Sequence, residues 1–479
     1  MTAADPRSGC AGVVPLTGRL EAWELDLCRH PDLLRDWLER YGSPLNVLDP
    51  RPLRRNAAEL LDVGGRHGVD LKIFFARKAN KCLALVDQAR RLGLGVDVAS
   101  EAELRQVLAR GVPAADVVVT AAVKSAALLE VCVANGVTVV IDNHDEYEQL
   151  AGTAERSGKP ATVALRLAPT LAGRPPTRFG LSIQDAVAVA GKGGGALSVA
   201  GVHFHIDGYA AADRVSAAAA ALDLVDALRD HGHTPGFLDI GGGIPMSYVD
   251  SADEWDRFWS EHRRGLLGER APVTFEGHSL GNVYPFHQEP VQAAWLDQVL
   301  GGEIVVSGQR RSLAEAIRER GVRLRCEPGR ALLDGCGMTA ARVAFRKQRG
   351  DGTWLIGVEM NRTQCRSGSD DFLVDPLLIR PRTSGTTRPT GPIEAYLVGA
   401  YCIERELLTW RRLSFPDGVE VGDIVIFPNT AGYLMHLLES SSHQLPLARN
   451  LIVTPPGAPY VDPIDAASPG ASGPRDHRS

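Results

Sequence analysis

The feature that most constrains the fold is a pattern that recurs eight times between about residues 70 and 330. Each copy holds a short apolar run, a turn and an amphipathic stretch. The apolar runs are rich in β-branched residues and lack polar alternation, which is typical of parallel strands buried on both faces. The runs are IFFARK (73–78), GVDVAS (95–100), DVVVTA (116–121), VTVVID (137–142), TVALRLA (162–168), VAGVHFHI (199–206), GFLDIGG (236–242) and VRLRCE (322–327).

Helical patterns occupy the stretches between these runs, for example at 81–93, 100–111, 211–232 and 312–321. Ser100 followed by Glu103 predicts a capping box at the start of one helix. Eight βα units can close on themselves and leave no edge strand. The count therefore favours an α/β fold of the (β/α)₈ TIM-barrel type over an open, doubly wound sheet.

The barrel is expected to span 51–330, with an insertion at about 250–310 between the seventh and eighth runs. This insertion is rich in aromatic residues, and loops of such length are usually functional, so we predict a lid or a substrate-facing segment. Residues 331–454 read as short strands with Gly-, Pro-, Asn- and Asp-rich turns, which predicts a C-terminal β-barrel or β-sandwich domain. Residues 1–50 include PLNVLD, which has the same strand-like pattern and is expected to join that domain. Residues 455–479 are rich in Pro, Gly and Ser and are expected to form a disordered tail.

Composition excludes several function classes. The formal net charge of −6 and scattered arginines give no basic stripe for nucleic acid. No apolar run reaches 18 residues, so no membrane span is expected, and the N-terminus lacks a signal-peptide pattern, which favours the cytoplasm. The eight cysteines stand singly, without a C-x-x-C pair, which argues against a disulfide framework or a zinc knuckle.

Chemical groups of four kinds stand at the predicted ends of the strands, where barrel active sites form. They are an amine, imidazole rings, a glycine turn and a carboxylate. Pyridoxal 5'-phosphate (PLP) requires this combination, because it needs an amine for its aldehyde, a ring to stack on, amides for its phosphate and an acid for its pyridine nitrogen. The residues of these four kinds are Lys78, His203, His205, Gly241, Gly242, Gly243 and Glu327, and Arg330 also stands at the end of the eighth run.

Each of these residues could also have a purely structural role. A single lysine is usually a solvated charge, but Lys78 ends an apolar run, where burial favours a neutral amine. A glycine triplet often marks a plain turn, yet it also lets backbone amides approach a phosphate. An acid before Pro-Gly, such as Glu327, can simply form a turn. His203 and His205 share a strand face with no third ligand in sight, so we expect no metal.

Together these motifs resemble the fold-type III PLP enzymes of the diaminopimelate, ornithine and arginine decarboxylase family, over residues 41–452. FARKAN resembles the family's Schiff-base motif at Lys78, and GVHFHI its ring-stacking histidine, His205. DIGGG is similar to the phosphate loop, and CEPGR to the segment with the pyridinium carboxylate Glu327, followed by Gly329 and Arg330. NTAGYLMHL resembles the terminal motif whose tyrosine, here Tyr433, reaches the phosphate.

The resemblance also assigns a role to Cys402. VGAYCIERELL is similar to the family's Gly-Pro-x-Cys segment, whose cysteine enters the active site of the partner subunit and protonates the carbanion left after CO₂ departs. The resemblance therefore implies a homodimer with shared active sites. A buried structural thiol is the alternative reading of Cys402.

Three positions depart from the family pattern. Asp207 stands where the family has a phosphate-binding serine after the stacking histidine, and a carboxylate there repels a phosphate unless it is protonated or turned towards substrate. Gly399-Ala400 replaces Gly-Pro. Ile403 replaces the acid that grips the distal ammonium of diamino acids, although Glu404 or Glu406 could substitute. These changes favour a larger, modified or carrier-bound amino acid as substrate, as in a specialised biosynthetic pathway.

The sequence thus predicts a PLP-dependent carboxy-lyase that acts on an α-amino acid or a derivative of one. A racemase or epimerase of the same fold is the alternative enzyme, and it would need two acid–base groups on opposite sides of Cα. A non-catalytic PLP-binding homologue is the third reading, but such proteins usually lose the lysine or the cysteine, and both are present.

Overall fold

The computed structural model describes residues 5–192, 195–306, 308–368, 370, 372–382, 389–454 and 457–466. The chain forms two compact units. The barrel unit comprises Leu53–Pro245 and Pro290–Leu332, and the sheet unit comprises Met1–Pro52, Met246–Glu289 and Leu333–Ser479. Of the predicted insertion at about 250–310, the residues up to Glu289 belong to the sheet unit and those from Pro290 onwards belong to the barrel unit.

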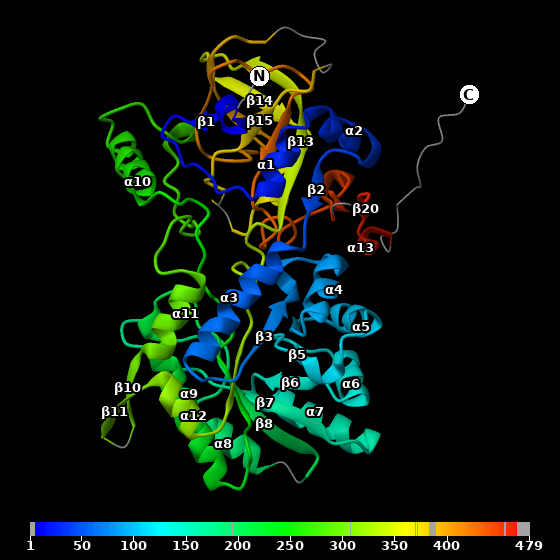
Figure 1. The fold of residues 1–479 in the computed structure, drawn as a ribbon, viewed down its shortest axis with the longest axis vertical. Helices are drawn as coiled ribbons and strands as arrows, with labels where there is room; N and C mark the ends of the chain where they lie inside the picture. The colour runs from blue at the N-terminus through cyan, green and yellow to red at the C-terminus, as the bar shows by residue number, and fades with distance from the viewer. Residues whose placement is uncertain are drawn as a thin grey trace, which may run out of the picture. The chain divides into compact units, whose positions relative to one another are not determined.

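The barrel unit contains a closed ring of eight parallel strands, in the order β12-β3-β4-β5-β6-β7-β8-β9 (Figure 1). The predicted (β/α)₈ fold is confirmed. Each strand overlaps one of the eight apolar runs, and most strand residues are buried, as continuous β-branched runs require. The strands are β3 (Leu71–Ala76), β4 (Gly95–Val98), β5 (Val117–Val119), β6 (Thr138–Ile141), β7 (Ala161–Arg166), β8 (Leu197–His203), β9 (Phe237–Asp239) and β12 (Arg323–Cys326).

Some of the barrel helices begin at capping side chains. Ser125 and Asn143 accept hydrogen bonds from backbone N–H groups in the first turns of α6 and α7. The predicted capping box at Ser100 is only half present: Ser100 accepts from the Glu103 N–H, but the Glu103 carboxylate binds the Ala99 N–H instead. The helices are α3 (Pro52–Arg66), α4 (Leu83–Arg91), α5 (Glu101–Ala109), α6 (Ala126–Asn135), α7 (His144–Ser157), α8 (Ile183–Gly191), α9 (Ala211–Asp230), α11 (Gln292–Gly301) and α12 (Leu313–Glu319), and a hairpin of β10 (Glu303–Val306) and β11 (Gln309–Ser312) precedes α12.

Apolar side chains from five strands form one buried cluster in the barrel unit: Phe74, Val118, Val140, Ala164 and Phe237. Because each comes from a different strand, the cluster ties the strands of the ring to one another. The barrel is therefore a packed core, and the polar chemistry described below belongs to the residues at the carboxyl ends of its strands.

The sheet unit is built mostly from β-strands, as predicted. β13 (Gly337–Gln348) is its longest strand and pairs with β2, β14 and β18. β2 (Leu45–Leu48), which lies in PLNVLD, also pairs in parallel with β19. The other strands are β1 (Ala11–Gly12), β14 (Trp354–Val358), β15 (Leu377–Ile379), β16 (Ile393–Val398), β17 (Leu413–Phe415), β18 (Ile424–Phe427), β19 (Arg449–Ile452) and β20 (Tyr460–Val461).

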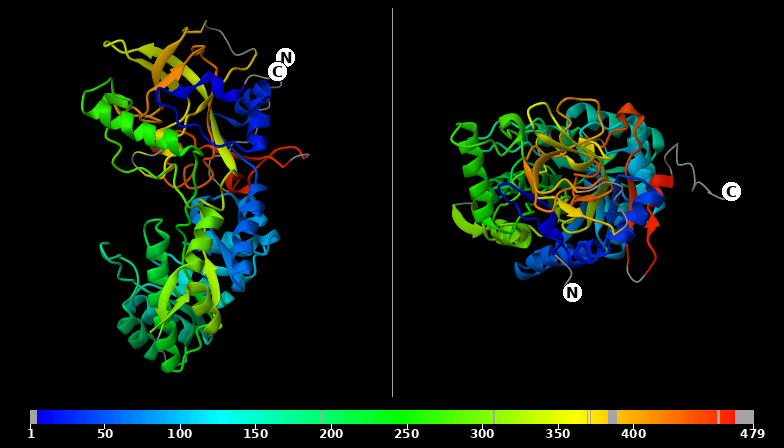
Figure 2. Two further views of the ribbon diagram at one scale, coloured as in Figure 1. Left: turned by 60° about the vertical axis from the view of Figure 1, so that its left-hand side comes forward. Right: turned by 90° about the horizontal axis from the view of Figure 1, so that it is seen from above.

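The described residues of the sheet unit include the α-helices α1 (Ala22–Cys28), α2 (Pro31–Tyr41), α10 (Ala252–Leu266) and α13 (Pro463–Ala466). α10 carries Trp255, Phe258 and Trp259 from the aromatic stretch of the predicted insertion, and Figure 2 shows it beside the strands of this unit. Phe258 on α10 is buried, and the Arg411 guanidinium lies 5.1 Å from its ring centroid. Within the described residues, no helix is long and apolar enough to cross a membrane.

The expected disordered tail is wrong for residues 460–466, which form β20 and α13. Asp462 between them is fully buried, and its N–H donates to the Asn450 carbonyl. The Asp465 carboxylate accepts from both the backbone and the side-chain amide of Asn450. These hydrogen bonds stabilise regular structure in a segment whose Pro- and Gly-rich composition predicts disorder. The rest of the predicted tail, from 467 onwards, lies outside the described residues.

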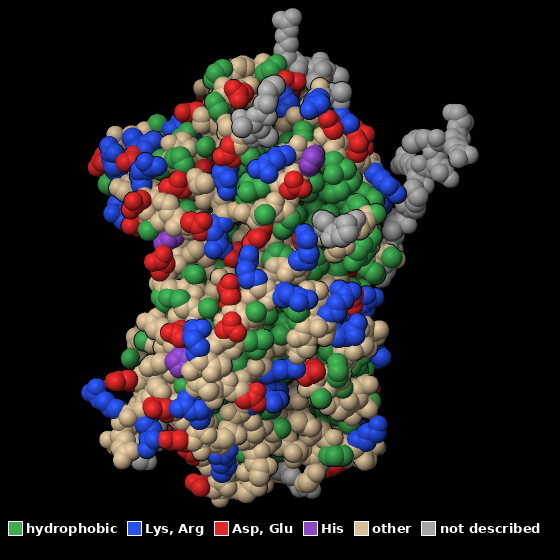
Figure 3. Space-filling view, in the orientation of Figure 1, with side chains coloured by type: hydrophobic (Ala, Val, Ile, Leu, Met, Phe, Trp, Pro, Cys, Tyr) green, Lys and Arg blue, Asp and Glu red, His purple; other side chains and the backbone are tan. Residues whose placement is uncertain are grey.

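The largest apolar area on the face shown in Figure 3 lies over α1 and α2. A surface hollow of about 580 Å³ opens there, and Trp23, Leu27, Leu33, Trp37 and Val453 are among the residues that line it.

Candidate active site

Lys78 stands just beyond the end of β3, in a 3₁₀ turn (Arg77–Ala79). Its Nζ lies 3.2 Å from Oδ2 of Asp97, which is buried at the carboxyl end of β4. The Thr120 hydroxyl donates to the other Asp97 oxygen at 2.6 Å. The Lys78 side chain is 40% exposed, so a buried carboxylate orients an amine that a small molecule can still reach.

Glu327 follows β12 and is 2% exposed. Its Oε1 lies 3.4 Å from His203 Nε2, and Asp239 at the end of β9 also contacts it. Burial and the Asp97 charge raise the pKa of Glu327, which Lys78 and Arg166 oppose. Burial, followed by the Glu327 charge, likewise raises the pKa of Asp239. The two acids therefore sit close together in a dry pocket, which favours one proton held between them.

His203 is neutral in this pocket, because burial lowers its pKa to about 3. One expectation about it is wrong. Ligand atoms of His203, Asp239 and Glu327 lie within 4.8 Å of one another, so a third ligand does stand near the histidine. Asp239 and Glu327 stand at the ends of two other strands, β9 and β12, and so lie far from His203 in the sequence.

The glycine turn after β9 approaches its neighbours too closely for any side chain. A Cβ on Gly241 would lie 2.7 Å from the Phe204 carbonyl oxygen, and one on Gly242 would lie 2.7 Å from the Glu327 carbonyl oxygen. Gly241 and Gly243 have φ values of +68° and +75°, which other residues rarely adopt. His205 also borders the turn, since its Nδ1 lies 2.9 Å from the Cβ position of Gly241. Burial lowers the pKa of His205 well below its usual value, so this ring is also neutral.

Arg166 at the end of β7 was not predicted as a site residue. It is 5% exposed, and its Nη1 lies 3.2 Å from Asp142 Oδ1. Its guanidinium also stacks 4.2 Å from the Phe179 ring centroid. Arg166 influences Glu327 and His205 electrostatically, which places its positive charge among the predicted site residues. The signal available in the sequence was its position at the end of the fifth apolar run.

The remaining predicted residues of the barrel unit differ in exposure. Asp207 is exposed, Gly329 is buried and Arg330 is partly exposed. The Pro328 carbonyl accepts from the Ala76 N–H at 3.3 Å, which links the segment after β12 to the end of β3. The structure therefore gathers Lys78, His205, the glycine turn and Glu327 at one end of the barrel.

Cys402 and Tyr433 belong to the sheet unit. Cys402 is exposed, whereas the other cysteines are buried. The neighbouring Ile403 is 45% exposed. Glu406 is buried, and its carboxylate accepts from the Arg362 N–H at 2.8 Å and pairs with the Arg362 side chain. The loop of Cys402 thus exposes a thiol and an apolar side chain. The Glu406 carboxylate in the same loop is hydrogen-bonded to Arg362.

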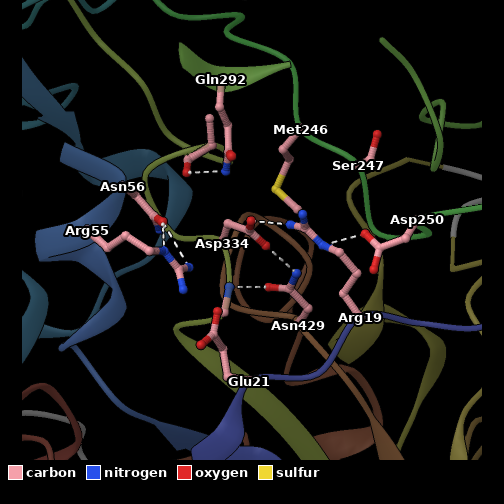
Figure 4. Close-up of polar contacts among 12 residues, drawn as sticks. Arg19, Glu21, Arg55, Asn56, Met246, Ser247, Asp250, Gln292, Asp334 and Asn429 are labelled. Carbon is pink, nitrogen blue, oxygen red and sulfur yellow. Dashed lines mark hydrogen bonds and ion pairs between the residues drawn. The ribbon is translucent and has the colours of Figure 1, made fainter. Parts of the chain in front are cut away.

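Tyr433 adopts a left-handed conformation with φ +71°, in a loop that begins at Asn429. Figure 4 shows how this loop is anchored within the sheet unit. Asn429 Nδ2 donates to Asp334 at 2.7 Å, and Asn429 Oδ1 accepts from the Gly335 N–H at 2.8 Å. Arg19 pairs with both Asp334 and Asp250. The network fixes the start of the segment that carries Tyr433.

Comparison with known proteins identifies the family of this chain. Residues 55–274 match the family described as the pyridoxal-binding domain of pyridoxal-dependent decarboxylases. The chain is 33% identical to an uncharacterized protein of Sinorhizobium fredii, over 89% of this chain and 91% of that one. The chain belongs to the pyridoxal-dependent decarboxylases.

Further similar proteins are named as diaminopimelate decarboxylases. The diaminopimelate decarboxylase of Actinosynnema pretiosum is 25% identical, over 90% of this chain and 88% of that protein. The crystal structure of the Helicobacter pylori diaminopimelate decarboxylase, complexed with L-lysine, shares the fold with a TM-score of 0.68 at 17% identity, over 89% of this chain and 95% of that chain. As a member of this family, the protein is a PLP-dependent carboxy-lyase.

The residues at the end of the barrel fit this cofactor. Two buried carboxylate oxygens, Asp239 Oδ2 and Glu327 Oε1, have no hydrogen-bond partner, so the pocket can accept a proton-bearing ring nitrogen. The glycine turn leaves no room for a Cβ, which suits backbone amides that must approach a phosphate. An accessible amine at Lys78 completes the set.

Proposed function

We propose that the protein decarboxylates an α-amino acid, with Lys78 holding PLP through Nζ and Cys402 returning a proton to Cα. One observation carries this proposal. Lys78 and Glu327 follow β3 and β12, two strands that pair directly through Ile73 and Cys326. An amine and a carboxylate at neighbouring strand ends suit the aldehyde and the ring nitrogen, which lie on opposite sides of the PLP ring.

Other residues would position the cofactor. His205 would stack on the ring, and the Gly241–Gly243 turn would bind the phosphate, with Gly329, Arg330, Tyr433 and Asp207 as further candidates near it. Bound PLP supplies an electron sink for the pair of electrons left when the bond between Cα and the carboxylate breaks. Glu327 keeps a proton at the ring nitrogen, supported by Asp239 and by the neutral His203.

Two residues handle the remaining protons. Asp97 orients the Lys78 amine and can accept a hydrogen bond from Nζ. The exposed thiol of Cys402 can donate a proton to Cα after CO₂ leaves. Since Cys402 is exposed, the proposal includes a homodimer in which this thiol serves the partner's site, as the family resemblance implies.

Mixing two inactive variants tests the shared site. Lys78→Ala and Cys402→Ala proteins should each be inactive, but a mixture that exchanges subunits should recover about a quarter of the native activity. Half of the dimers would then be mixed, and each mixed dimer would have one intact site out of two. Activity would be measured as CO₂ release. Mixing Lys78→Ala with Cys132→Ala, which removes a buried thiol, should give more activity, because one of its partners is itself active.

A mixture of Lys78→Ala and Cys402→Ala that stays inactive, while subunit exchange is verified with tagged chains, would show that each site lies within one chain. Full activity in Cys402→Ala alone would remove the proposed role of the thiol.

We infer that the substrate lacks a distal ammonium group. Ile403 offers no charge, and Glu406 is bonded to Arg362. Glu404 lines a surface hollow of about 400 Å³ with Lys347, Arg349, Arg405 and Glu276, and both arginines pair with Glu276. A neutral, modified or carrier-bound amino acid fits this loop better than a diamino acid does.

A panel of amino acids tests both the reaction and the substrate class. The purified protein, loaded with PLP, should release CO₂ from neutral or carrier-linked amino acids faster than from lysine, ornithine or diaminopimelate. In D₂O the amine product should carry one deuterium at Cα. Labelled α-amino acid without CO₂ would instead identify a racemase, and no turnover of any kind would support a non-catalytic homologue. Fastest release from a diamino acid would overturn the inference from Ile403.

A further inference from the structure

Arg214 is a buried cation for which the proposed function has no role. It lies in the first turn of α9 and is 0% exposed. Its Nη1 donates to the Ile240 carbonyl at 2.7 Å, but its Nε and Nη2 have no hydrogen-bond partner. Among the described residues, no carboxylate lies within ion-pair distance of this guanidinium. Such an arrangement is rare, because buried charges are normally paired.

The guanidinium lies directly against the glycine turn. Ile240, which accepts its one hydrogen bond, immediately precedes Gly241. A Cβ on Gly243 would lie 2.7 Å from Arg214 Nη2, so the turn can pass this close only because residue 243 is a glycine. The positive charge and the backbone amides of the turn therefore occupy the same small region.

Two aromatic rings hold the guanidinium in place. Its central carbon lies 5.9 Å from the ring centroid of Phe204 and 5.5 Å from that of Trp295 on α11. The Trp295 indole donates to the Tyr209 carbonyl at 2.6 Å, which fixes the ring over this region. The surrounding structure thus specifies the position of Arg214.

The charge of Arg214 persists at neutral pH. Burial lowers its pKa to about 10, which leaves the guanidinium protonated. The barrel therefore keeps a positive charge beside the turn that forms no ion pair among the described residues, although the charges of Asp213 and Glu327 act on it from further away. A bound phosphate dianion would balance this charge, and charge-assisted hydrogen bonds to a phosphate are among the stronger polar contacts in proteins.

We propose that Arg214 is a phosphate-positioning residue: its buried guanidinium supports the Gly241–Gly243 turn and balances the charge of the cofactor phosphate bound there. This inference rests on the proposed assignment of the turn to the phosphate. It also accounts for phosphate binding in a chain that has Asp207, an exposed acid, where a phosphate-binding serine is expected.

Comparison of PLP with pyridoxal, which lacks the phosphate, tests the role of Arg214. Both compounds would be titrated into the apoprotein and followed by their visible absorbance. Arg214→Met should weaken PLP binding by roughly tenfold to a hundredfold, as expected for a hydrogen-bonded charge, and should leave pyridoxal binding within about twofold. Arg214→Lys should recover part of the PLP affinity, because it retains the charge.

Arg325→Met provides the matched control, since this arginine lies 3.4 Å from the Phe237 ring centroid and, unlike Arg214, is not among the atoms nearest the Cβ positions of Gly241–Gly243. It should bind PLP and pyridoxal in the native ratio. Equal loss of both ligands in Arg214→Met and Arg214→Lys would show a purely structural role, and unchanged PLP affinity would also overturn the proposal.

Inorganic phosphate gives a second measurement that does not depend on Lys78. Calorimetry on the wild-type apoprotein should detect phosphate binding, and Arg214→Met should abolish it. If wild type binds phosphate but shows no visible band with PLP, the assignment of Lys78 fails while the role of Arg214 stands. If wild type shows the band but does not distinguish PLP from pyridoxal, the role of Arg214 fails.

Discussion

Replacing Lys78 by alanine should remove the visible absorbance band of PLP bound to the protein and lower CO₂ release by at least about a thousandfold. Lys78 carries the amine that stands beside Asp97 at the end of the barrel, at a distance of 3.2 Å. Without it, the cofactor aldehyde has no covalent attachment, although the glycine turn can still bind the phosphate. Absorbance spectra and CO₂ assays at saturating PLP measure the two effects separately.

Lys72→Ala is the matched control for this prediction. Lys72 lies on the same strand, β3, but its amine donates to the Gly93 carbonyl and pairs with Asp116. Its loss should leave the band and the activity close to native. A persistent band in Lys78→Ala, resistant to dialysis, would show that another amine holds the cofactor.

Replacing Glu327 by glutamine should lower kcat by about a hundredfold to a thousandfold, the range typical for loss of a preorganised charge. The amide removes the negative charge that keeps a proton at the ring nitrogen, so the electron sink weakens. Lys78 remains, and the absorbance band should therefore still form. The neighbouring Asp239 should not compensate, because it stands on a different strand, β9, and an aspartate there does not occupy the position of the lost Glu327 carboxylate.

Glu327→Asp separates charge from distance, since it retains the carboxylate but shortens the side chain. It should be more active than Glu327→Gln. Glu315→Gln, an exposed capping residue of α12, is the control for loss of an acid elsewhere in the barrel unit. Native kcat in Glu327→Gln would exclude the proposed contact with the ring nitrogen.

The strands of the barrel could be predicted because their pattern is local. Runs such as VTVVID and DVVVTA are buried on both faces, and short continuous runs of β-branched residues are typical of parallel strands. The division at residue 290 could not be predicted, because it depends on which unit each half of the insertion contacts. The order in residues 460–466 was missed for the same reason, since it depends on hydrogen bonds between Asn450 and Asp465.

The residues of the site could likewise be predicted only where their signal is local in the sequence. Lys78, Glu327 and the glycine turn stood out because each ends an apolar run. Asp239 and Arg166 also lie in such runs. The role of a carboxylate or a guanidinium at this position cannot be predicted, because it depends on the neighbouring side chains in the folded chain. A role for Arg214 could not be predicted from the sequence, because the residue lies in an alanine-rich helix and contacts the glycine turn only in the folded chain.

The order of the strands has a consequence for biosynthesis. Lys78 follows the first strand of the ring, whereas Glu327 follows the last, and these two strands pair with each other. A nascent chain that ends before residue 323 already carries the lysine, the histidines and the glycine turn, but its barrel cannot close. Capture of the cofactor by the complete site must therefore wait until the ribosome has delivered β12, so loading with PLP is expected to be a late event in the synthesis of each chain.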